Sequence, residues 1–135
     1  MDDRINNLLE AAKKAYNNAY VPNSNFSVGA ALLTENGTIY AGANVENACY
    51  AMGQCAEASA IGHMITQEGA AKIQTIVVIG DAKLPIVPCG GCLQKLSEFT
   101  TKDTEVYCYT KAGEAKKYLF SELQPVTFDH SSMDT

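Results

Sequence analysis

Cys55, Glu57, Cys89 and Cys92 are the side chains of this sequence best suited to chemistry. Cys89 and Cys92 are three apart, so on a helix they share one face and can both reach a single ion. Helix starts carry partial positive charge and free N–H groups, which favour the thiolates that a metal requires. If Cys55 and Cys89 begin two facing helices, three thiolates could bind zinc and leave its fourth position open for water, as in catalytic sites.

The cysteine pair alone leaves several interpretations open. A Cys-x-x-Cys segment can be a redox pair, half of a structural zinc site or two buried thiols. The combination is more specific, because Cys55-Ala56-Glu57 followed by Pro88-Cys89-Gly90-Gly91-Cys92 matches the signature of zinc deaminases. Residues two apart lie on opposite sides of a regular helix. Cys55 and Glu57 can therefore serve one site only at an exposed first turn.

The elements that must position these residues follow from hydrophobic spacing and from turn residues. Asn36-Gly37 lies between two short apolar runs and predicts a hairpin, and Gly69 predicts a helix end. The expected helices are residues 2–19, 54–68, 89–99 and 115–123, and the expected strands are 27–34, 38–43, 73–79 and 106–109. This order predicts an α/β protein, a three-layer α-β-α sandwich with a central mixed sheet.

Composition limits the classes of protein that the chain can form. Its 135 residues are 47% hydrophobic, which predicts one catalytic domain over residues 1–135 with a flexible tail from about 131. The net charge of −5 disfavours a nucleic-acid partner. No run of ~18 apolar residues and no export signal are present, so we expect no membrane partner and a cytoplasmic location. Five cysteines, an odd number, do not suit a disulfide framework.

Four segments in order, and a fifth near the C-terminus, resemble the homotetrameric type of cytidine deaminase, from about Ala15 to Phe128. The metal-binding segments are two of the regions that carry the likeness. Residues 21–32 (VPNSNFSVGAAL) are similar to the family's first-strand segment, and residues 44–50 (NVENACY) to its sugar-binding segment. Residues 123–128 (LQPVTF) are similar to its closing segment. Chance agreement over these regions in the same order is very improbable, so the family's fold and chemistry become expectations for this chain.

The resemblance implies roles in substrate binding for Phe26, Asn44, Glu46, Tyr50, Ala56 and Phe128. Asn44 and Glu46 would bind the ribose hydroxyls, and Phe26 would wall the base pocket. Tyr50 would line a site shared between subunits, and Phe128 would reach the base bound by a neighbouring subunit. Taken without the resemblance, Phe26 could equally be a core residue, Asn44 a turn residue and Glu46 a solvated carboxylate.

The implied reaction is zinc-dependent hydrolytic deamination of cytidine and deoxycytidine to uridine and deoxyuridine, with release of ammonia for pyrimidine salvage. The resemblance implies one Zn²⁺ per subunit and a homotetramer acting on a small-molecule nucleoside. Glu57 would take a proton from water, pass it to ring atom N3 and later help protonate the departing amino group. The alternative role for Glu57 is a carboxylate that stabilises a helix N-terminus.

Two residues depart from the family pattern and leave other functions open. Ala58 and Leu93 stand where the family has arginines. Three thiolates exceed the charge of one divalent ion, so a neutralising group could come from helix N–H groups, Gln54, Gln94 or Lys95. Blasticidin-type deaminases also lack the first arginine, but they do not keep the Asn-x-Glu-Asn segment found here. A catalytically weak nucleoside-binding relative is a further alternative, which retention of the glutamate argues against.

The remaining cysteines and His63 lack motif partners. We expect Cys49 and Cys108 to be buried small hydrophobic residues, as free cysteine usually is. His63 falls inside a predicted helix, where a lone histidine is usually structural.

The first of these departures yields a test at position 58. Because an arginine there would offset thiolate charge, we predict that Ala58→Arg changes the zinc affinity or the pH profile of activity. Zinc titration and rate measurements from pH 5 to 9 on both proteins would show this. Superimposable curves would mean that the charge is already balanced without the arginine.

Overall fold

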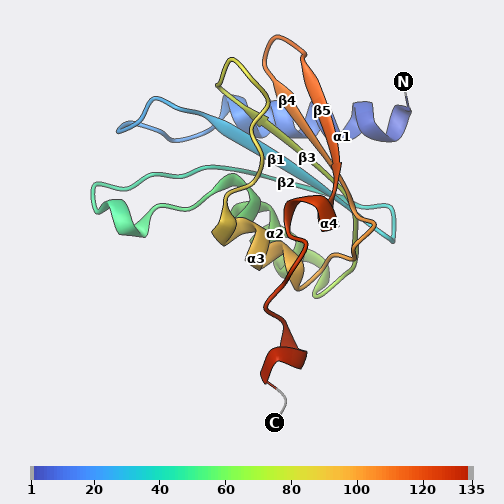
Figure 1. The fold of residues 1–135 in the computed structure, drawn as a ribbon. Helices are drawn as coiled ribbons and strands as arrows, with labels where there is room; N and C mark the ends of the chain where they lie inside the picture. The colour runs from blue at the N-terminus through green and yellow to red at the C-terminus, as the bar shows by residue number, and fades with distance from the viewer. Residues whose placement is uncertain (1, 134–135) are drawn as a thin grey trace.

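The structure is a computed structural model that describes residues 2–133 (Figure 1). Its helices are α1 (Asp3–Asn17), α2 (Ala56–Glu68), α3 (Gly90–Ser97) and α4 (Phe120–Leu123). Its strands are β1 (Val28–Thr34), β2 (Ile39–Ala43), β3 (Ile73–Gly80), β4 (Glu105–Thr110) and β5 (Ala115–Leu119). Two short 3-10 helices, η1 (Tyr50–Met52) and η2 (His130–Met133), lie in the loop before α2 and near the C-terminus.

The five strands form one mixed sheet in the order β2-β1-β3-β4-β5. Only the central pair β3 and β4 is parallel, and the other pairs are antiparallel. The predicted hairpin joins β1 to β2, with Gly37 at a φ of 86° that glycine adopts without strain. Val28 pairs with Gly80, which places the start of β1 beside the end of β3. The candidate functional residues gather near these two strand ends.

Side chains alternate between two hydrophobic cores on the two faces of the sheet. Leu32 and Val78 face α2 and α3, whereas Leu33 and Val77 face α1. Figure 1 shows the same layers, with α1 apart from the neighbouring helices α2 and α3. Period-two alternation in β1 and β3 produces this arrangement because successive residues of a strand point to opposite faces. The predicted three-layer α-β-α sandwich is confirmed.

The helix predicted for residues 115–123 is wrong over its first half. Ala115–Leu119 is the edge strand β5, and only Phe120–Leu123 is helical. A turn at Gly113, whose φ is 99°, brings the chain back along β4. Lys117 then pairs with Glu105 at 2.8 Å across the two strands. These tertiary contacts override the helix preference of the Ala, Lys and Leu residues in this stretch.

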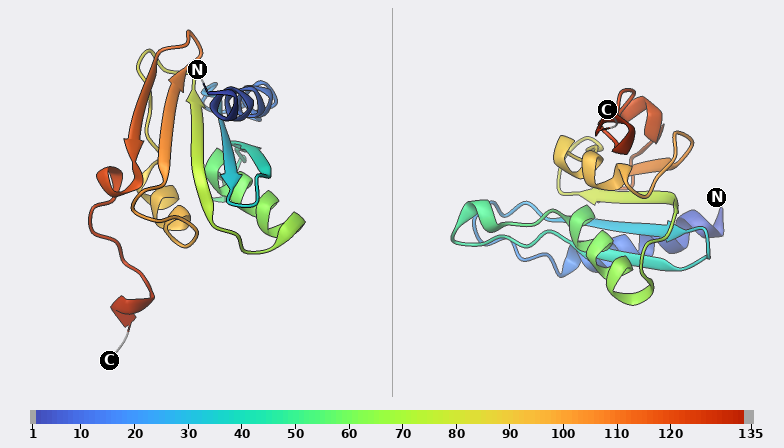
Figure 2. Two further views of the ribbon diagram at one scale, coloured as in Figure 1. Left: turned by 90° about the vertical axis from the view of Figure 1, so that its right-hand side faces the viewer. Right: turned by 90° about the horizontal axis from the view of Figure 1, so that it is seen from below.

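Two segments extend beyond the layers. The paired loops at residues 20–27 and 44–54 project from one end of the sheet, and the chain after α4 runs away from the body (Figure 2). Residues 130–133 form η2, and residues 134 and 135 lie outside the described residues, so the flexible tail expected from about 131 stays a prediction. Among the described helices, none combines the length and apolar character needed to cross a bilayer.

Gly42 brings β2 close to α2, the helix that carries Glu57. A Cβ atom at Gly42 would lie 2.3 Å from the Ala60 backbone nitrogen and 2.7 Å from the Ala56 carbonyl oxygen. Backbone atoms cannot yield as a flexible side chain can. The absence of a side chain at Gly42 therefore allows the start of α2 to pack closely against β2.

We predict that Gly42→Ala lowers the free energy of unfolding by about 1–3 kcal/mol, because overpacking forces α2 away from β2. Thermal unfolding monitored by circular dichroism measures the loss. Gly62→Ala is the matched control, since a Cβ at Gly62 on α2 meets nothing within 4 Å. Its effect should be neutral or stabilising by up to about 1 kcal/mol. Equal melting temperatures for the two variants would contradict the close packing.

Candidate metal centre and active site

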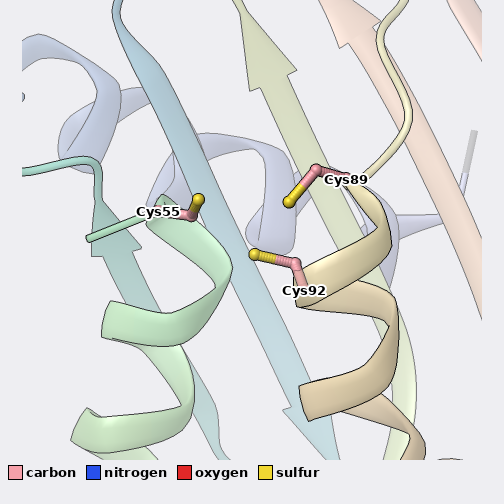
Figure 3. Close-up of side chains that lie close together, drawn as sticks. All are labelled: Cys55, Cys89 and Cys92. Atoms are coloured by element: carbon pink, nitrogen blue, oxygen red, sulfur yellow. The ribbon is translucent and has the colours of Figure 1, made fainter. Parts of the chain in front are cut away.

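Three cysteine sulfur atoms meet where α2 and α3 begin. Cys55 is the N-cap residue of α2, Cys89 is the N-cap of α3, and Cys92 follows in the first turn of α3. Their Sγ atoms all lie within 4.8 Å of one another (Figure 3). The two helix starts thus bring together residues separated by more than thirty positions in the sequence. The remaining cysteines among the described residues do not belong to this group.

The protein environment treats these thiols differently. The backbone N–H of Cys92 is the main cause that lowers the pKa of Cys89, assisted by that of Gly91. Burial raises the pKa of Cys55 and of Cys92, which is only 2% exposed. Neighbouring negative groups add to both increases. A thiolate at Cys92 therefore requires nearby positive charge, which a metal cation supplies.

The donor set fits a zinc ion. Zinc binds cysteine sulfur at about 2.3 Å, and two sulfurs of a tetrahedral site lie about 3.8 Å apart. Sulfur atoms within 4.8 Å of one another need only small side-chain adjustments to reach that geometry. Three sulfur donors leave one tetrahedral position for water or substrate, which distinguishes a catalytic from a structural zinc site.

Glu57 lies beside the sulfur atoms and is 4% exposed. Burial raises the pKa of its carboxyl group, opposed by the backbone N–H of Glu57 and the side chain of Cys92. The concern that Cys55 and Glu57 would lie on opposite sides of a helix does not arise here. Cys55 has an extended conformation, with φ of −74° and ψ of 157°, and precedes the first helical residue. The non-helical cap lets both side chains contribute to one cavity.

A cavity of about 150 Å³ is bordered by Glu57 and by Cys55 and Cys89, two of the three clustered cysteines. It is lined by Val28, Asn44, Cys55, Ala56, Glu57, Ile86, Val87 and Cys89. Five of the residues singled out in the sequence thus meet at one place. The sequence analysis missed the three aliphatic residues. Ile86 and Val87 directly precede Pro88 and Cys89, and this apolar run beside a metal ligand was the signal that could have identified them.

Asn44 and Phe26 form part of the same edge of the sheet. The Val28 backbone N–H donates to Asn44 Oδ1 at 2.9 Å, and Asn44 Nδ2 donates to the Phe26 carbonyl oxygen at 2.9 Å. Phe26 is half-buried near the end of β3, 3.9 Å from where a Cβ of Gly80 would lie. Asn44 therefore fixes the chain before β1 while its side chain borders the cavity.

Glu46 and Tyr50 line a different cavity of about 300 Å³ on the projecting loops. The Glu46 carboxylate accepts hydrogen bonds from the backbone N–H groups of Asn23, at 2.9 Å, and Ser24, and from the Ser24 hydroxyl. The Ser24 hydroxyl is the main cause that lowers the pKa of Glu46. Within one chain, the structure does not bring Glu46 or Tyr50 to the cavity that contains Glu57.

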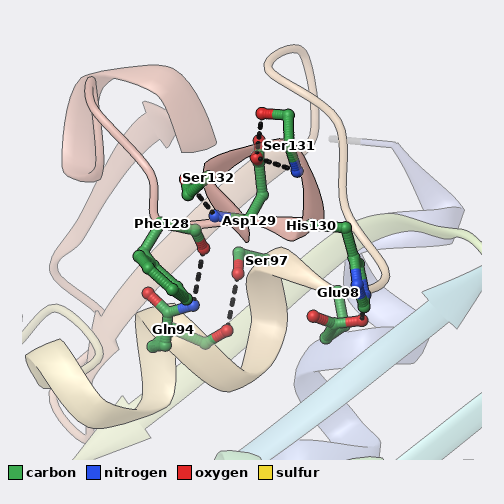
Figure 4. Close-up of polar contacts among 8 residues, drawn as sticks. All are labelled: Gln94, Ser97, Glu98, Phe128, Asp129, His130, Ser131 and Ser132. Atoms are coloured by element: carbon green, nitrogen blue, oxygen red, sulfur yellow. Dashed lines mark hydrogen bonds and ion pairs between the residues drawn. The ribbon is translucent and has the colours of Figure 1, made fainter. Parts of the chain in front are cut away.

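Phe128 lies on the C-terminal segment, which is fastened to α3 (Figure 4). Gln94 Nε2 donates to the Phe128 carbonyl oxygen at 2.8 Å, and His130 Nε2 lies 3.1 Å from Glu98 Oε1. The Phe128 side chain is 60% exposed and does not line the metal cavity of its own chain. The side-chain amide of Gln94 therefore binds the C-terminal segment and not the sulfur atoms.

The other residues proposed as neutralising groups lie along a groove between α2 and α3. Gln54 and Lys95 line it together with Ala58. Gln54 Nε2 donates to the Ser59 hydroxyl at 3.2 Å. The backbone N–H groups of Cys92 and Gly91, at the start of α3, lower the pKa of the Cys89 thiol.

The cysteines outside the cluster divide into one exposed and one buried residue. The prediction of burial is confirmed for Cys108, where burial raises the pKa to about 12. It is wrong for Cys49, which is exposed because it lies on the projecting loop just before η1. His63 Nδ1 lies 3.2 Å from the Ala41 carbonyl oxygen, and its ring meets Tyr40 edge-on. These contacts are consistent with a structural histidine.

The fold, the sulfur cluster and the buried glutamate together define a metal-dependent deaminase class, and residues 2–109 match the family model for the cytidine and deoxycytidylate deaminase zinc-binding region. The chain belongs to this family. It is 40% identical to a cytidine deaminase of Halalkalibacterium halodurans over 127 residues, covering 94% of this chain and 96% of that protein. It is 37% identical to a cytidine deaminase of Sporosarcina psychrophila over 129 residues, covering 96% and 94%.

A solved structure shows the same architecture. The crystal structure of cytidine deaminase from Burkholderia pseudomallei matches with a TM-score of 0.85 and 38% identity, covering 91% of this chain and 98% of that one. The predicted membership of the cytidine deaminase family and the predicted fold are both confirmed by these comparisons.

We predict that Cys92→Ala weakens zinc binding by more than about 100-fold, beyond the ~10–100-fold loss typical when a group hydrogen-bonded to a ligand is removed. The effect is larger because the variant lacks one of the sulfur donors themselves, and not only a group that contacts a donor. Competition against a chromogenic chelator gives the affinity, and elemental analysis gives the zinc content per chain. Cys49→Ala is the control, because Cys49 lies outside the cluster. Equal zinc affinity in both variants would argue against the assigned ligands.

Proposed function

We propose that this protein hydrolyses cytidine and deoxycytidine to uridine and deoxyuridine with release of ammonia. One Zn²⁺ per chain would be held by Cys55, Cys89 and Cys92. The observation that carries the proposal is that the buried Glu57 and two cysteines of the sulfur cluster, Cys55 and Cys89, line one cavity together with aliphatic residues. The family membership and the named relatives support the choice of reaction.

Glu57 is the group that moves protons in this proposal. Cys55, Cys89 and Cys92 would hold the zinc ion, which when bound would supply a nucleophile at neutral pH by lowering the pKa of a water molecule. Glu57 would accept one proton of the water and transfer it to N3 of the ring while the water oxygen bonds to C4. It would then move the remaining hydroxyl proton to the amino group, so that the C4–N bond breaks, the C4 oxygen becomes a carbonyl and ammonia leaves. Burial, which raises the pKa of Glu57, favours a carboxyl that can both take and return a proton.

The rest of the cavity suits a nucleoside. Ala56 is the first helical residue of α2, so its backbone N–H has no partner within the helix and can donate to a ring oxygen. Asn44 borders the cavity and offers a polar side chain for a ribose hydroxyl. Phe26, half-buried at the same edge, supplies an apolar surface for the base. Aliphatic walls with a few polar groups are typical of small-molecule sites.

Residues far from this cavity support an assembly with sites shared between subunits. Tyr50 is 80% exposed on the projecting loop at residues 44–54, and Phe128 is 60% exposed on the C-terminal segment beside α3. We propose a homotetramer in which Glu46, Tyr50 and Phe128 complete cavities at subunit contacts. The mass of the assembly in solution tests this arrangement. We also propose that residues 1–135 form one catalytic domain. Its reaction would serve pyrimidine salvage in the cytoplasm.

We predict that Glu57→Ala lowers kcat for cytidine by about 10²–10⁴-fold, the range expected for a lost general acid–base group. Zinc content and melting temperature should stay close to those of the unchanged protein. Ammonia release and the change in ultraviolet absorbance measure turnover. Glu10→Ala, an exposed substitution on α1, controls for the general effect of removing a carboxylate.

Substantial residual turnover by the Glu57→Ala protein would contradict the assigned role. The substrate class is tested by the same assay with cytosine, blasticidin and single-stranded oligonucleotides. Cytidine and deoxycytidine should be the compounds converted. A zinc-loaded, folded protein that leaves all of them unchanged would overturn the proposed function.

A further inference from the structure

Ile86 packs directly over Gly80 at the end of β3. A Cβ atom at Gly80 would lie 2.5 Å from Ile86 Cδ1 and 2.8 Å from Ile86 Cγ1. These distances are far below a van der Waals contact, so the side chain occupies the space that any other residue at position 80 would fill. Ile86 also lines the cavity that contains Glu57. The missing side chain of Gly80 therefore determines how far Ile86 withdraws from that cavity.

The loop that carries Ile86 is held at both ends. The Asp81 backbone N–H donates to the Ser27 carbonyl oxygen at 3.0 Å, and Lys111 Nζ lies 3.1 Å from the Asp81 carboxylate. At the other end the chain enters α3 through Cys89. Pro85 and Pro88 restrict the backbone between these points. Ile86 is thus part of a fixed wall, while the neighbouring Leu84 is 69% exposed and lines no part of this cavity.

The chemistry of a pyrimidine ring decides which of its edges suits this wall. The inference rests on the proposed function, in which C4 and N3 are presented to Glu57. The polar edge of the ring carries N3 and O2, whereas the C5–C6 edge presents only C–H bonds. Ile86 and Val87 are aliphatic and immediately precede the segment that contains Cys89. An apolar ring edge is best matched by an apolar wall, because neither then leaves a polar group without a partner.

We propose that Ile86, seated on Gly80, is a specificity-determining residue that contacts the C5–C6 edge of the substrate ring. It limits the substituent that the site accepts at C5. The preferred substrate class is therefore a cytosine nucleoside with hydrogen at C5. A larger group at that position meets a side chain that cannot move further toward Gly80, because Ile86 already fills the space above that residue.

The first test compares kcat/KM for cytidine and 5-methylcytidine in the zinc-loaded protein. Ile86→Ala should raise the ratio of 5-methylcytidine to cytidine by about 10-fold or more, the range found for one methylene in an apolar pocket. Ile86→Val, which removes only Cδ1, should raise it less and guards against misfolding. Leu84→Ala is the control from the same loop and should leave the ratio unchanged. Electronic effects of the methyl group cancel, because each ratio is compared with that of the unchanged protein.

The second test uses thermal unfolding to examine the contact between Ile86 and Gly80. Gly80→Ala should lower the melting temperature, and adding Ile86→Ala should restore part of the loss, because the clashing atoms are then absent. Losses that simply add would overturn the contact between the two residues. This measurement needs no turnover and can be made on the protein with or without zinc.

The outcomes separate this inference from the proposed function. If the unchanged protein converts cytidine but Ile86→Ala and Ile86→Val leave the 5-methylcytidine ratio unaltered, the specificity role is wrong and the deaminase function stands. If the zinc-loaded protein converts neither nucleoside, the proposed function fails, and the specificity role fails with it. A raised ratio in both Ile86 variants, together with partial rescue of Gly80→Ala, supports the inference.

Discussion

Negative charge concentrated between two helix starts is the constraint on which the site depends. Three cysteine sulfurs lie within 4.8 Å of one another, and the carboxyl of Glu57 is buried beside them. Ionising all of these groups in a poorly solvated place is unfavourable unless a cation and helix N–H groups offset the charge. A metal ion held by Cys55, Cys89 and Cys92 would join the start of α2 to the start of α3, a helix of only eight residues. Such an ion would support the position of α3 as well as supply reactivity.

Local signals in the sequence were sufficient for most of the fold. The Asn36-Gly37 turn, the helix end at Gly69 and the mostly β-branched run at residues 73–79 each have a local physical cause, and the structure contains all three elements. The strand β5 was missed because its partner β4 and the turn at Gly113 decide its conformation. Helix propensity carries no information about such pairing.

The site was predictable where spacing along the chain reports proximity. Cys89 caps α3 and Cys92 lies in its first turn, so their spacing of three residues reports proximity, and a known pattern linked them to Cys55 and Glu57. The exposure of Cys49 and the separate cavity of Glu46 depend on how the long loop before α2 is placed, which no local pattern determines. The contribution of Ile86 depends on the register that puts Val28 opposite Gly80, and this is a property of the assembled sheet. Distant contacts of this kind become visible only in three dimensions.

The sheet separates the two hydrophobic cores from each other. Residues facing α1 pack on one side of the sheet, and the cavity with its sulfur atoms lies toward α2 and α3 on the other. Ile5, Leu8 and Leu33 line no part of the cavity, so substitutions among them can change the melting temperature without changing a residue that lines it. Over evolutionary time, adaptation to temperature and adaptation of chemistry can therefore proceed on opposite faces of the same sheet.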